Sequence, residues 1–158
     1  LPAGTRVLRD LPYIENGHER QKLDLYLPAD TNAAVPLIIW IHGGAWKGGS
    51  KDRCPAVRFL SQGYAVASVN YRLSQHAIFP AQIQDCKAAV RWLRAHAIEH
   101  RLDPNRFAAW GSSAGGHLVA LLGEFAHDVE ARHRAVHLVL LAHLHRDRHG
   151  QIAQLRRA

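Results

Sequence analysis

A serine surrounded by small residues is the feature of the sequence that most directly suggests chemistry. Residues 111–115 read Gly-Ser-Ser-Ala-Gly, between an apolar run at 107–111 and an apolar stretch at 117–122. A sharp turn from a strand into a helix needs small residues on both sides of its central residue, and it lifts that residue clear of the sheet. The N-terminus of the helix then favours developing negative charge. We therefore expect Ser113 to be a catalytic nucleophile.

A glycine pair earlier in the chain suggests the groups that would stabilise such charge. Residues 42–46 read His-Gly-Gly-Ala-Trp and end an apolar run at 36–42. Glycines at this place let backbone N–H groups approach a carbonyl oxygen without obstruction by side chains. We expect Gly43 and Gly44, together with the N–H of Ala114, to form an oxyanion hole, which would stabilise the transition state of acyl transfer.

The elements that would position these motifs alternate between strands and helices. Continuous apolar runs predict strands that are buried on both faces, at 36–42, 64–71 and 107–111. Stretches that begin with proline predict helices at 55–62 and from 80 to about 100. The alternating segment 20–28 predicts an antiparallel edge strand. This order predicts an α/β fold with a parallel sheet and helices on both faces.

The motifs and their order resemble the acetyl-esterase and hormone-sensitive-lipase-like branch of the α/β-hydrolases. The resemblance covers about residues 20–123 and is carried by four segments, at 42–46, 70–73, 79–92 and 111–117. It implies a parallel-sheet α/β-hydrolase core with an N-terminal antiparallel edge. It also implies hydrolysis of short-chain, acetyl-type carboxylic esters through an acyl-enzyme on Ser113, with a small-molecule ester as partner and no cofactor. Trp46 and Tyr71 are candidates for the substrate pocket, and each would fit the core equally well.

The composition changes after Gly123. Residues 124–158 contain six of the twelve histidines and six of the sixteen arginines, and only 136–144 looks like a further core element. We expect residues 1–123 to form the N-terminal half of an α/β-hydrolase, and residues 124–158 to be a tail unlike the family. The fold would then be an incomplete three-layer sandwich, and the sequence is expected to be truncated or frame-shifted after about residue 123.

The other members of a catalytic triad are not evident from the sequence. In this fold the acid and the base follow the serine in the chain, and only 45 residues follow Ser113. A triad is defined by geometry, so histidines of the tail could substitute for the base, and a partner subunit is another source. The candidates are His137, His143, His145 and His149, with Asp147 as an orienting carboxylate.

Three residues near the motifs invite catalytic roles that we do not assign to them. His42 ends a predicted strand, and we expect it to hold its loop by hydrogen bonds instead of acting as the base. His117 follows Ser113 by one helical turn, and we expect it to pack beside the site. Asp85 precedes the serine in the chain, so we expect a structural salt link to Arg72 instead of the role of triad acid.

Two alternatives to a working esterase stay open from the sequence. One is a catalytically impaired hydrolase fragment that acts as an oligomeric or binding scaffold, and in either case an exposed sheet edge would favour a homodimer. The other is a metal site, because His133 and His137 are four residues apart and His143 and His145 are two apart. No cysteine or carboxylate pattern accompanies these histidines, so we expect no metal.

Composition narrows the classes of partner. With 47% hydrophobic and 21% charged residues, the chain resembles a globular protein. The net charge of +7 would suit an anionic partner, but the basic residues are scattered, and we expect no nucleic acid. The longest apolar run, 35–41, is too short for a membrane helix, so we expect no membrane partner. No signal peptide is evident, which favours a cytoplasmic location by default, and Cys54 and Cys86 are expected to be buried thiols.

Overall fold

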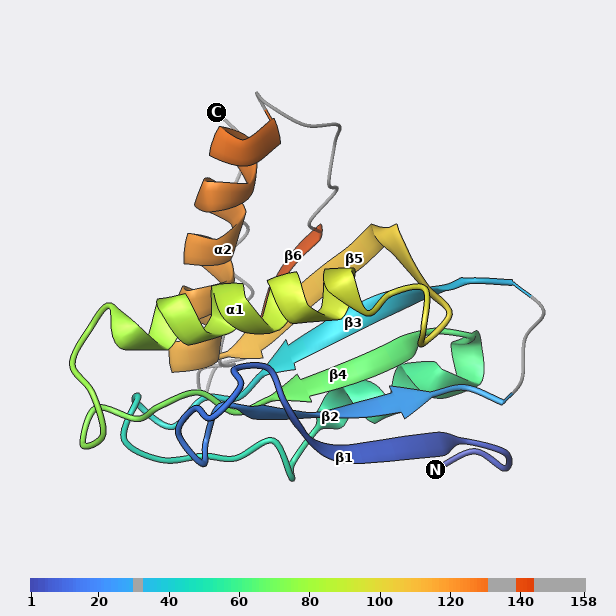
Figure 1. Cartoon of the computed structure of the whole chain (residues 1–158), viewed down its shortest axis with the longest axis horizontal. Coiled ribbons are helices and arrows are strands. Elements are labelled where there is room, and N and C mark those ends of the chain that lie inside the picture. Colours follow the sequence, from blue (N-terminus) through green and yellow to red (C-terminus); the bar gives the residue numbers. More distant parts are fainter. Residues whose placement is uncertain (30–32, 131–138, 144–158) are drawn as a thin grey trace, which may run out of the picture.

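The strands form one mixed sheet that carries helices on both faces. The computed structural model describes residues 1–29, 33–130 and 139–143. Within these residues six strands are hydrogen-bonded in the order β1-β2-β4-β3-β5-β6 (Figure 1). The strands are β1 (Arg6–Pro12), β2 (Lys22–Leu27), β3 (Val35–Ile41), β4 (Ala65–Val69), β5 (Leu102–Ser112) and β6 (Val139–His143). The helices are η1 (Pro55–Gln62, a 3-10 helix), α1 (Ala81–Ala95) and α2 (Ala114–Glu130).

The parallel half of the sheet agrees with the prediction. β3 pairs in parallel with both β4 and β5, and β5 pairs in parallel with β6. The three apolar runs are thus confirmed as central strands, and the α/β class is confirmed with them. β5 begins at Leu102, five residues before its expected start at Phe107. The earlier start was not predicted because residues 103–106, Asp-Pro-Asn-Arg, interrupt the apolar pattern.

The antiparallel half differs from the prediction in one respect. The segment 20–28 contains β2, which is antiparallel as expected, but β2 pairs with β1 on one side and with β4 on the other. The predicted edge position of this segment is therefore wrong, since β1 is the edge strand. The register of β1 shifts between Leu8 and Leu11, and its apolar residues do not alternate. The sequence pattern therefore did not predict this strand.

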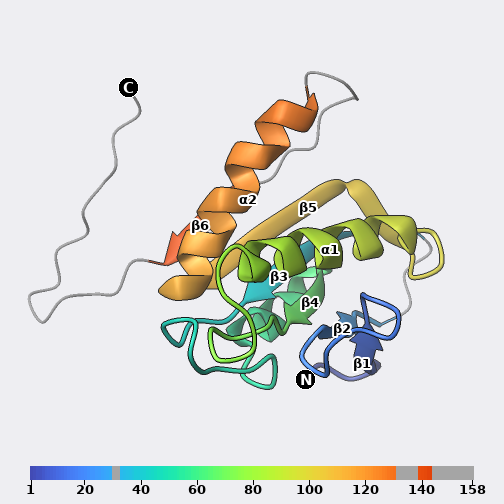
Figure 2. The same ribbon diagram turned by 60° about the vertical axis from the view of Figure 1, so that its left-hand side comes forward.

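Each face of the sheet has its own core. Along β3, Leu37, Ile39 and Ile41 belong to the core that α1 and α2 cover. The alternate residues Ile38 and Trp40 belong to a smaller core on the side of η1. A strand that contributes to both cores must be apolar throughout, which explains its continuous run. Figure 2 shows α1 and α2 together over one face of the sheet.

The helical segment predicted at 55–62 is confirmed as η1, whereas α1 and α2 end at other residues than the sequence predicted. α1 stops at Ala95, and turns lead from there to Arg101, which has a φ of 53°. α2 continues past Gly123, where the composition changes, and ends at Glu130. β6 then lies within 136–144, the segment that was expected to be a further core element. The division of the chain at residue 123 stays a prediction.

Two smaller observations concern the membrane and the thiols. No helix in the described part of the chain is long and apolar enough to cross a membrane. Both cysteines are free. Cys86 is buried as expected, and burial raises the pKa of its thiol, whereas Cys54 is only half-buried.

Candidate active site

The two motifs meet at the carboxyl ends of the parallel strands. β3 and β5 are neighbours, and their register places Ile41 level with Gly111. The chain therefore leaves both strands at the same edge of the sheet, where open α/β sheets usually bind their ligands. Residues 42–49 follow β3 and are called the glycine loop below. Residues 111–116 include the end of β5, Ser113 and the start of α2, and they are called the elbow.

Ser113 makes the sharp turn of the elbow by itself. β5 ends at Ser112 and α2 begins at Ala114. The φ of Ser113 is 53°, in the left-handed region that residues with a side chain seldom adopt. Its side chain is exposed, and its carbonyl oxygen accepts the N–H of His117 at 3.1 Å. The turn therefore presents the serine to solvent at the N-terminus of α2.

Two glycines of the elbow allow backbone segments to touch. A Cβ on Gly111 would collide with the backbone of Gly115. A Cβ on Gly115 would collide with the carbonyl of Ile41, and it would lie 2.6 Å from the carbonyl oxygen of His42. The start of α2 thus rests directly on the end of β3, and this contact fixes the elbow against the glycine loop.

Gly43 brings the backbone of the glycine loop beside Ser113. A Cβ on Gly43 would lie 2.6 Å from the carbonyl oxygen of Ser112 and 3.3 Å from Cβ of Ser113. The next residue, Gly44, has a φ of 112°, and its carbonyl oxygen accepts the amide of Gly48 at 3.0 Å. Both positions require glycine. At Gly43 there is no room for a side chain, and at Gly44 the backbone has a positive φ that residues with a side chain rarely adopt.

Three backbone amides are available near the serine. Those of Gly43 and Gly44 come from the glycine loop, and that of Ala114 begins α2, where amides lack partners within the helix. Within the described part of the chain, none of the three donates to a loop, turn or side-chain acceptor. A substrate oxygen at this edge of the sheet could therefore accept hydrogen bonds from them.

His42, the first residue of the glycine loop, is buried, and both of its ring nitrogens are engaged. Nδ1 lies 2.7 Å from the carbonyl oxygen of Gly43, and Nε2 lies 3.2 Å from Nη2 of Arg20. The ring stacks on that of Tyr71, with 4.4 Å between centroids. Burial lowers the pKa of His42 to about 4, and the charge of Arg20 acts in the same direction. His42 is therefore neutral near pH 7, and its contacts hold the loop, as the sequence predicted.

The two candidates for a substrate pocket occupy different environments. Tyr71 is fully buried, and its hydroxyl donates to the carbonyl oxygen of His42 at 3.0 Å, which favours the core alternative. Trp46 is 38% exposed, and its ring meets that of His117 edge to face, with 5.5 Å between centroids. Since His117 lies one helical turn after Ser113, Trp46 lies at the rim of the serine site.

The predicted salt link between Arg72 and Asp85 is confirmed. Asp85 is buried in α1, and its carboxylate accepts Nε of Arg72 at 2.9 Å and Nη2 at 2.7 Å. The backbone amide of Arg72 and Nε2 of Gln21 donate to the same carboxylate. This pair joins α1 to the segment after β4, so Asp85 has a structural role.

The sequence did not predict a cluster of charged residues around a buried carboxylate beside the glycine loop. Asp24 is fully buried in β2, and its carboxylate contacts Nζ of Lys51 and Nη1 of Arg9, each at 2.8 Å. Lys51 follows the glycine loop, and its amide donates to Oδ1 of Asn70 at 2.7 Å. The cluster thereby ties the end of the loop to the sheet. An aspartate between two leucines of an apolar strand was the signal that could have shown it.

A general base for Ser113 is not evident in the described part of the chain, which provides no hydrogen bond to its hydroxyl. His143 ends β6, and its backbone pairs level with Ser112 of β5, whereas its side chain lies outside the described residues. The other candidates also lie outside them: His133, His137, His145, His149 and Asp147. In the described ranges, no group of three His, Cys, Asp or Glu residues could hold a metal ion.

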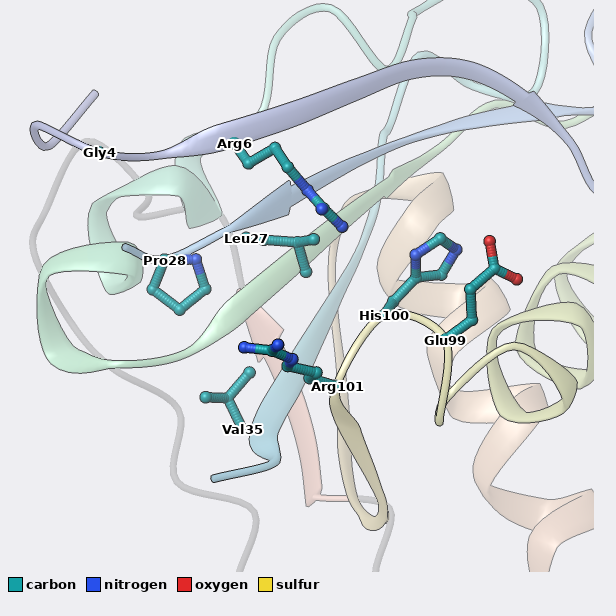
Figure 3. A pocket seen from close by; sticks show the side chains of 8 residues that line it. All are labelled: Gly4, Arg6, Leu27, Pro28, Val35, Glu99, His100 and Arg101. Atoms are coloured by element: carbon teal, nitrogen blue, oxygen red, sulfur yellow. The ribbon is translucent and has the colours of Figure 1, made fainter. Parts of the chain in front are cut away.

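A cavity of about 420 Å³ lies at the opposite end of the sheet (Figure 3). It is found where the parallel strands begin, since Val35 is the first residue of β3 and Arg101 precedes β5. Its other lining residues are Gly4, Arg6, Leu27, Pro28, Glu99 and His100. None of them belongs to the glycine loop or the elbow, so this cavity is separate from the serine site.

The chain matches known esterases in sequence. A family model described as BD-FAE matches residues 23–140, a range that includes both the glycine loop and the elbow. Carboxylesterase NlhH of Mycobacterium tuberculosis is 38% identical over 108 residues, which cover 66% of this chain and 34% of that protein. The chain thus spans about a third of the length of this curated relative.

Solved esterase structures share the fold. The structure of esterase B from Lactobacillus rhamnosis has a TM-score of 0.73 at 30% identity, and the match covers 90% of this chain and 47% of that one. A truncated form of a carbohydrate esterase from gut microbiota has a TM-score of 0.67 at 38% identity, with 72% and 41% covered. In both cases this chain corresponds to less than half of the other.

Proposed function

The chain belongs to the BD-FAE family of α/β-hydrolases, among carboxylesterases of the hormone-sensitive-lipase-like kind, and on this premise we propose that it hydrolyses carboxylic esters with Ser113 as the nucleophile. Oγ of Ser113 attacks the carbonyl carbon of the ester while the hydroxyl proton passes to a base. The C–O bond to the alcohol breaks, and the alcohol leaves with a proton. Water then hydrolyses the acyl-enzyme, which releases the acid and restores the serine.

The amides of Gly43, Gly44 and Ala114 stabilise the negative oxygen that forms in both steps. The register of β3 and β5 is the observation that carries this assignment, because it brings the glycine loop level with the elbow. The close approach of Gly43 to Ser113 supports it, as does the availability of the three amides. Loss of one such donor slows acyl-transfer enzymes by about 100-fold or more.

We assign short-chain, acetyl-type esters as the substrate class. The motifs at 42–46 and 111–117 resemble those of acetyl esterases, and the relatives named above are a carboxylesterase, an esterase and a carbohydrate esterase. Trp46 at the rim would contact either the acyl or the alcohol part of the ester, since its ring is partly exposed beside His117.

For the base we propose His143, because its backbone lies at the same edge of the sheet as Ser113. Strand β6 pairs in parallel with β5 and ends level with Ser112.

We also propose a homodimer as the partner arrangement. In the described part of the chain, β6 is the outermost strand on the side of the sheet away from β1, and its unpaired side would pair with a second copy.

Burst kinetics with 4-nitrophenyl acetate test the nucleophile. We expect release of about one equivalent of nitrophenol in a burst followed by slower turnover, because this activated ester acylates the serine faster than water hydrolyses the acyl-enzyme. Ser113→Ala removes both phases, and the matched control Ser112→Ala keeps them. Activity that persists in Ser113→Ala would overturn the serine mechanism. A wild-type protein without burst or turnover would support the alternative of an impaired scaffold.

The base is tested by the pair His143→Ala and His137→Ala. If His143 takes the proton of Ser113, its alanine variant slows acylation by about 100-fold or more, the usual contribution of a general base. The variant at position 137 then keeps the wild-type rate. Equal rates in the two variants would assign the base elsewhere.

A further inference from the structure

Arg20 connects both ends of the glycine loop to the segment that follows β4. It precedes β2, and its Nε donates to the carbonyl oxygen of Tyr71 at 2.9 Å. Its Nη2 lies 2.9 Å from the carbonyl oxygen of Gly49, 3.2 Å from Nε2 of His42 and 3.4 Å from Oδ1 of Asn70. Both ends of the glycine loop are therefore held by one guanidinium group.

These contacts determine which ring nitrogen of His42 carries the proton. A guanidinium group can only donate, so Nε2 of His42 must accept from Arg20 and cannot be protonated. A carbonyl oxygen can only accept, so Nδ1 must donate to Gly43 across the 2.7 Å between them. Both partners thus require the same neutral form of the ring, with its proton on Nδ1.

The bond from Nδ1 orients one of the proposed oxyanion donors. The carbonyl of Gly43 and the N–H of Gly44 belong to one planar peptide unit, in which they point in opposite directions. Since the carbonyl turns toward the buried ring of His42, the N–H of Gly44 turns away from it. Gly49 packs against the same unit, because a Cβ there would collide with Nδ1 of His42 and the carbonyl of Gly43.

We infer that Arg20 is a positioning residue for the oxyanion hole: it fixes His42 in its Nδ1-protonated neutral form, and His42 fixes the peptide unit that presents the amide of Gly44. The inference rests on the proposed function for its catalytic consequence. Its structural part, the state of His42, stands on hydrogen-bond chemistry alone. Arg20 lies outside both motifs, so the motifs do not reveal this role.

Protonation of His42 opposes this arrangement. A proton on Nε2 would face Nη2 of Arg20, so two donors and two positive charges would meet. The titratable groups that face the ring are Arg20, from the segment before β2, and Tyr71, after β4. Glu19 and Asp52 act on Arg20 from further away. Loss of Arg20 therefore makes the charged ring easier to form.

The test uses the full chain with Arg20→Ala, Arg20→Lys and the control Arg91→Ala, whose side chain is exposed on α1. Nitrogen NMR of the histidines reports the tautomer and the pKa of His42. The rate of reaction with a fluorophosphonate ester measures the reactivity of Ser113. In this reaction Oγ of Ser113 bonds to phosphorus, fluoride leaves and the hydroxyl proton passes to the base or solvent.

We expect the Nδ1-protonated form in the wild-type protein and in the control. Arg20→Ala mixes the tautomers, raises the pKa of His42 and slows phosphonylation by about tenfold or more, since small displacements of catalytic donors cost that much. The acid limb of the phosphonylation rate also moves to higher pH. Arg20→Lys restores part of the rate, because one ammonium group can reach fewer of the acceptors.

Three results would overturn the inference: a wild-type ring protonated on Nε2, an Arg20→Ala protein with unchanged tautomer, or one with an unchanged phosphonylation rate. If the alanine variant does not fold, Arg20→Gln takes its place, because its amide can donate to only part of the same set. If the wild-type serine fails to react, the proposed function fails, and the NMR result still decides the state of His42.

Discussion

The glycine loop and the elbow lie at one edge of the sheet, but they are held in different ways. The elbow is fixed by backbone contacts, in which Gly111 and Gly115 allow α2 to rest on β3. The glycine loop is fixed by side chains that come from other parts of the chain, chiefly Arg20, Asp24 and Asn70. One turn is therefore specified by its own sequence, and the other depends on polar residues far from its motif.

The largest effect on stability is expected when a side chain is added where the elbow contacts the end of β3. In Gly115→Ala the new Cβ would collide with the carbonyl of Ile41, and neither backbone can move away, so we expect a loss of about 3 kcal/mol or more in the free energy of unfolding. The matched control is Gly116→Ala, because a Cβ there would lie 3.4 Å from the nearest atom. Urea unfolding measures both, and equal stability of the two variants would contradict the close packing.

The next effect concerns the ion cluster that holds the end of the glycine loop. Asp24→Asn removes the buried charge that faces Lys51, and breaking such a buried pair should lower the free energy of unfolding by about 3 kcal/mol. The contact of Asp24 with the exposed Arg9 adds little to this loss. The control Asp103→Asn removes the partner of Arg106 at the surface, and its Tm should stay that of the wild type. A stable Asp24→Asn protein would show that the loop does not need the cluster.

A smaller effect is expected from pH. The pKa of His42 is lowered from 6.5 to about 4 in the folded chain, so the unfolded chain takes up the proton first as the pH falls. Stability should therefore fall below pH 6.5, by about 2 kcal/mol between pH 7 and pH 5 from this group. His42→Asn does not titrate, and its unfolding free energy should lack that part of the slope. An identical slope in both proteins would contradict the assignment.

The smallest effect on stability is expected at the rim. Trp46→Ala removes a partly exposed ring whose contact is with His117, so the loss should stay below about 1 kcal/mol. The KM for 4-nitrophenyl esters should rise, while phosphonylation of Ser113 continues. An unchanged KM for acetate and butyrate esters alike would remove Trp46 from the substrate site.

The same difference explains what could be predicted from the sequence. The elbow and the glycine loop were found because small residues at fixed spacing follow apolar runs, and carboxyl ends of neighbouring parallel strands must share an edge. Arg20 was not found, because a single arginine before a strand has no periodic or local signal. Asp24 had a signal, a charge inside an apolar strand, but its partners Lys51 and Arg9 are set by tertiary pairing alone.

The secondary structure shows the same division. β3 was predictable because both of its faces are buried. β1 was not, because an irregular register breaks its alternation. The end of α1 was predicted too late, since the stretch 96–100 is as compatible with a helix as with the turns that it forms.

The irregular edge strand β1 has a consequence for how copies of the chain meet. An open strand edge invites pairing with another chain, and bulges, charges and prolines hinder it. β1 has a register shift, exposed Arg6 and Arg9, and Pro12 at its end. At high concentration this side of the sheet should resist ordered aggregation, and fibrils or domain-swapped assemblies, where they form, should not grow from β1.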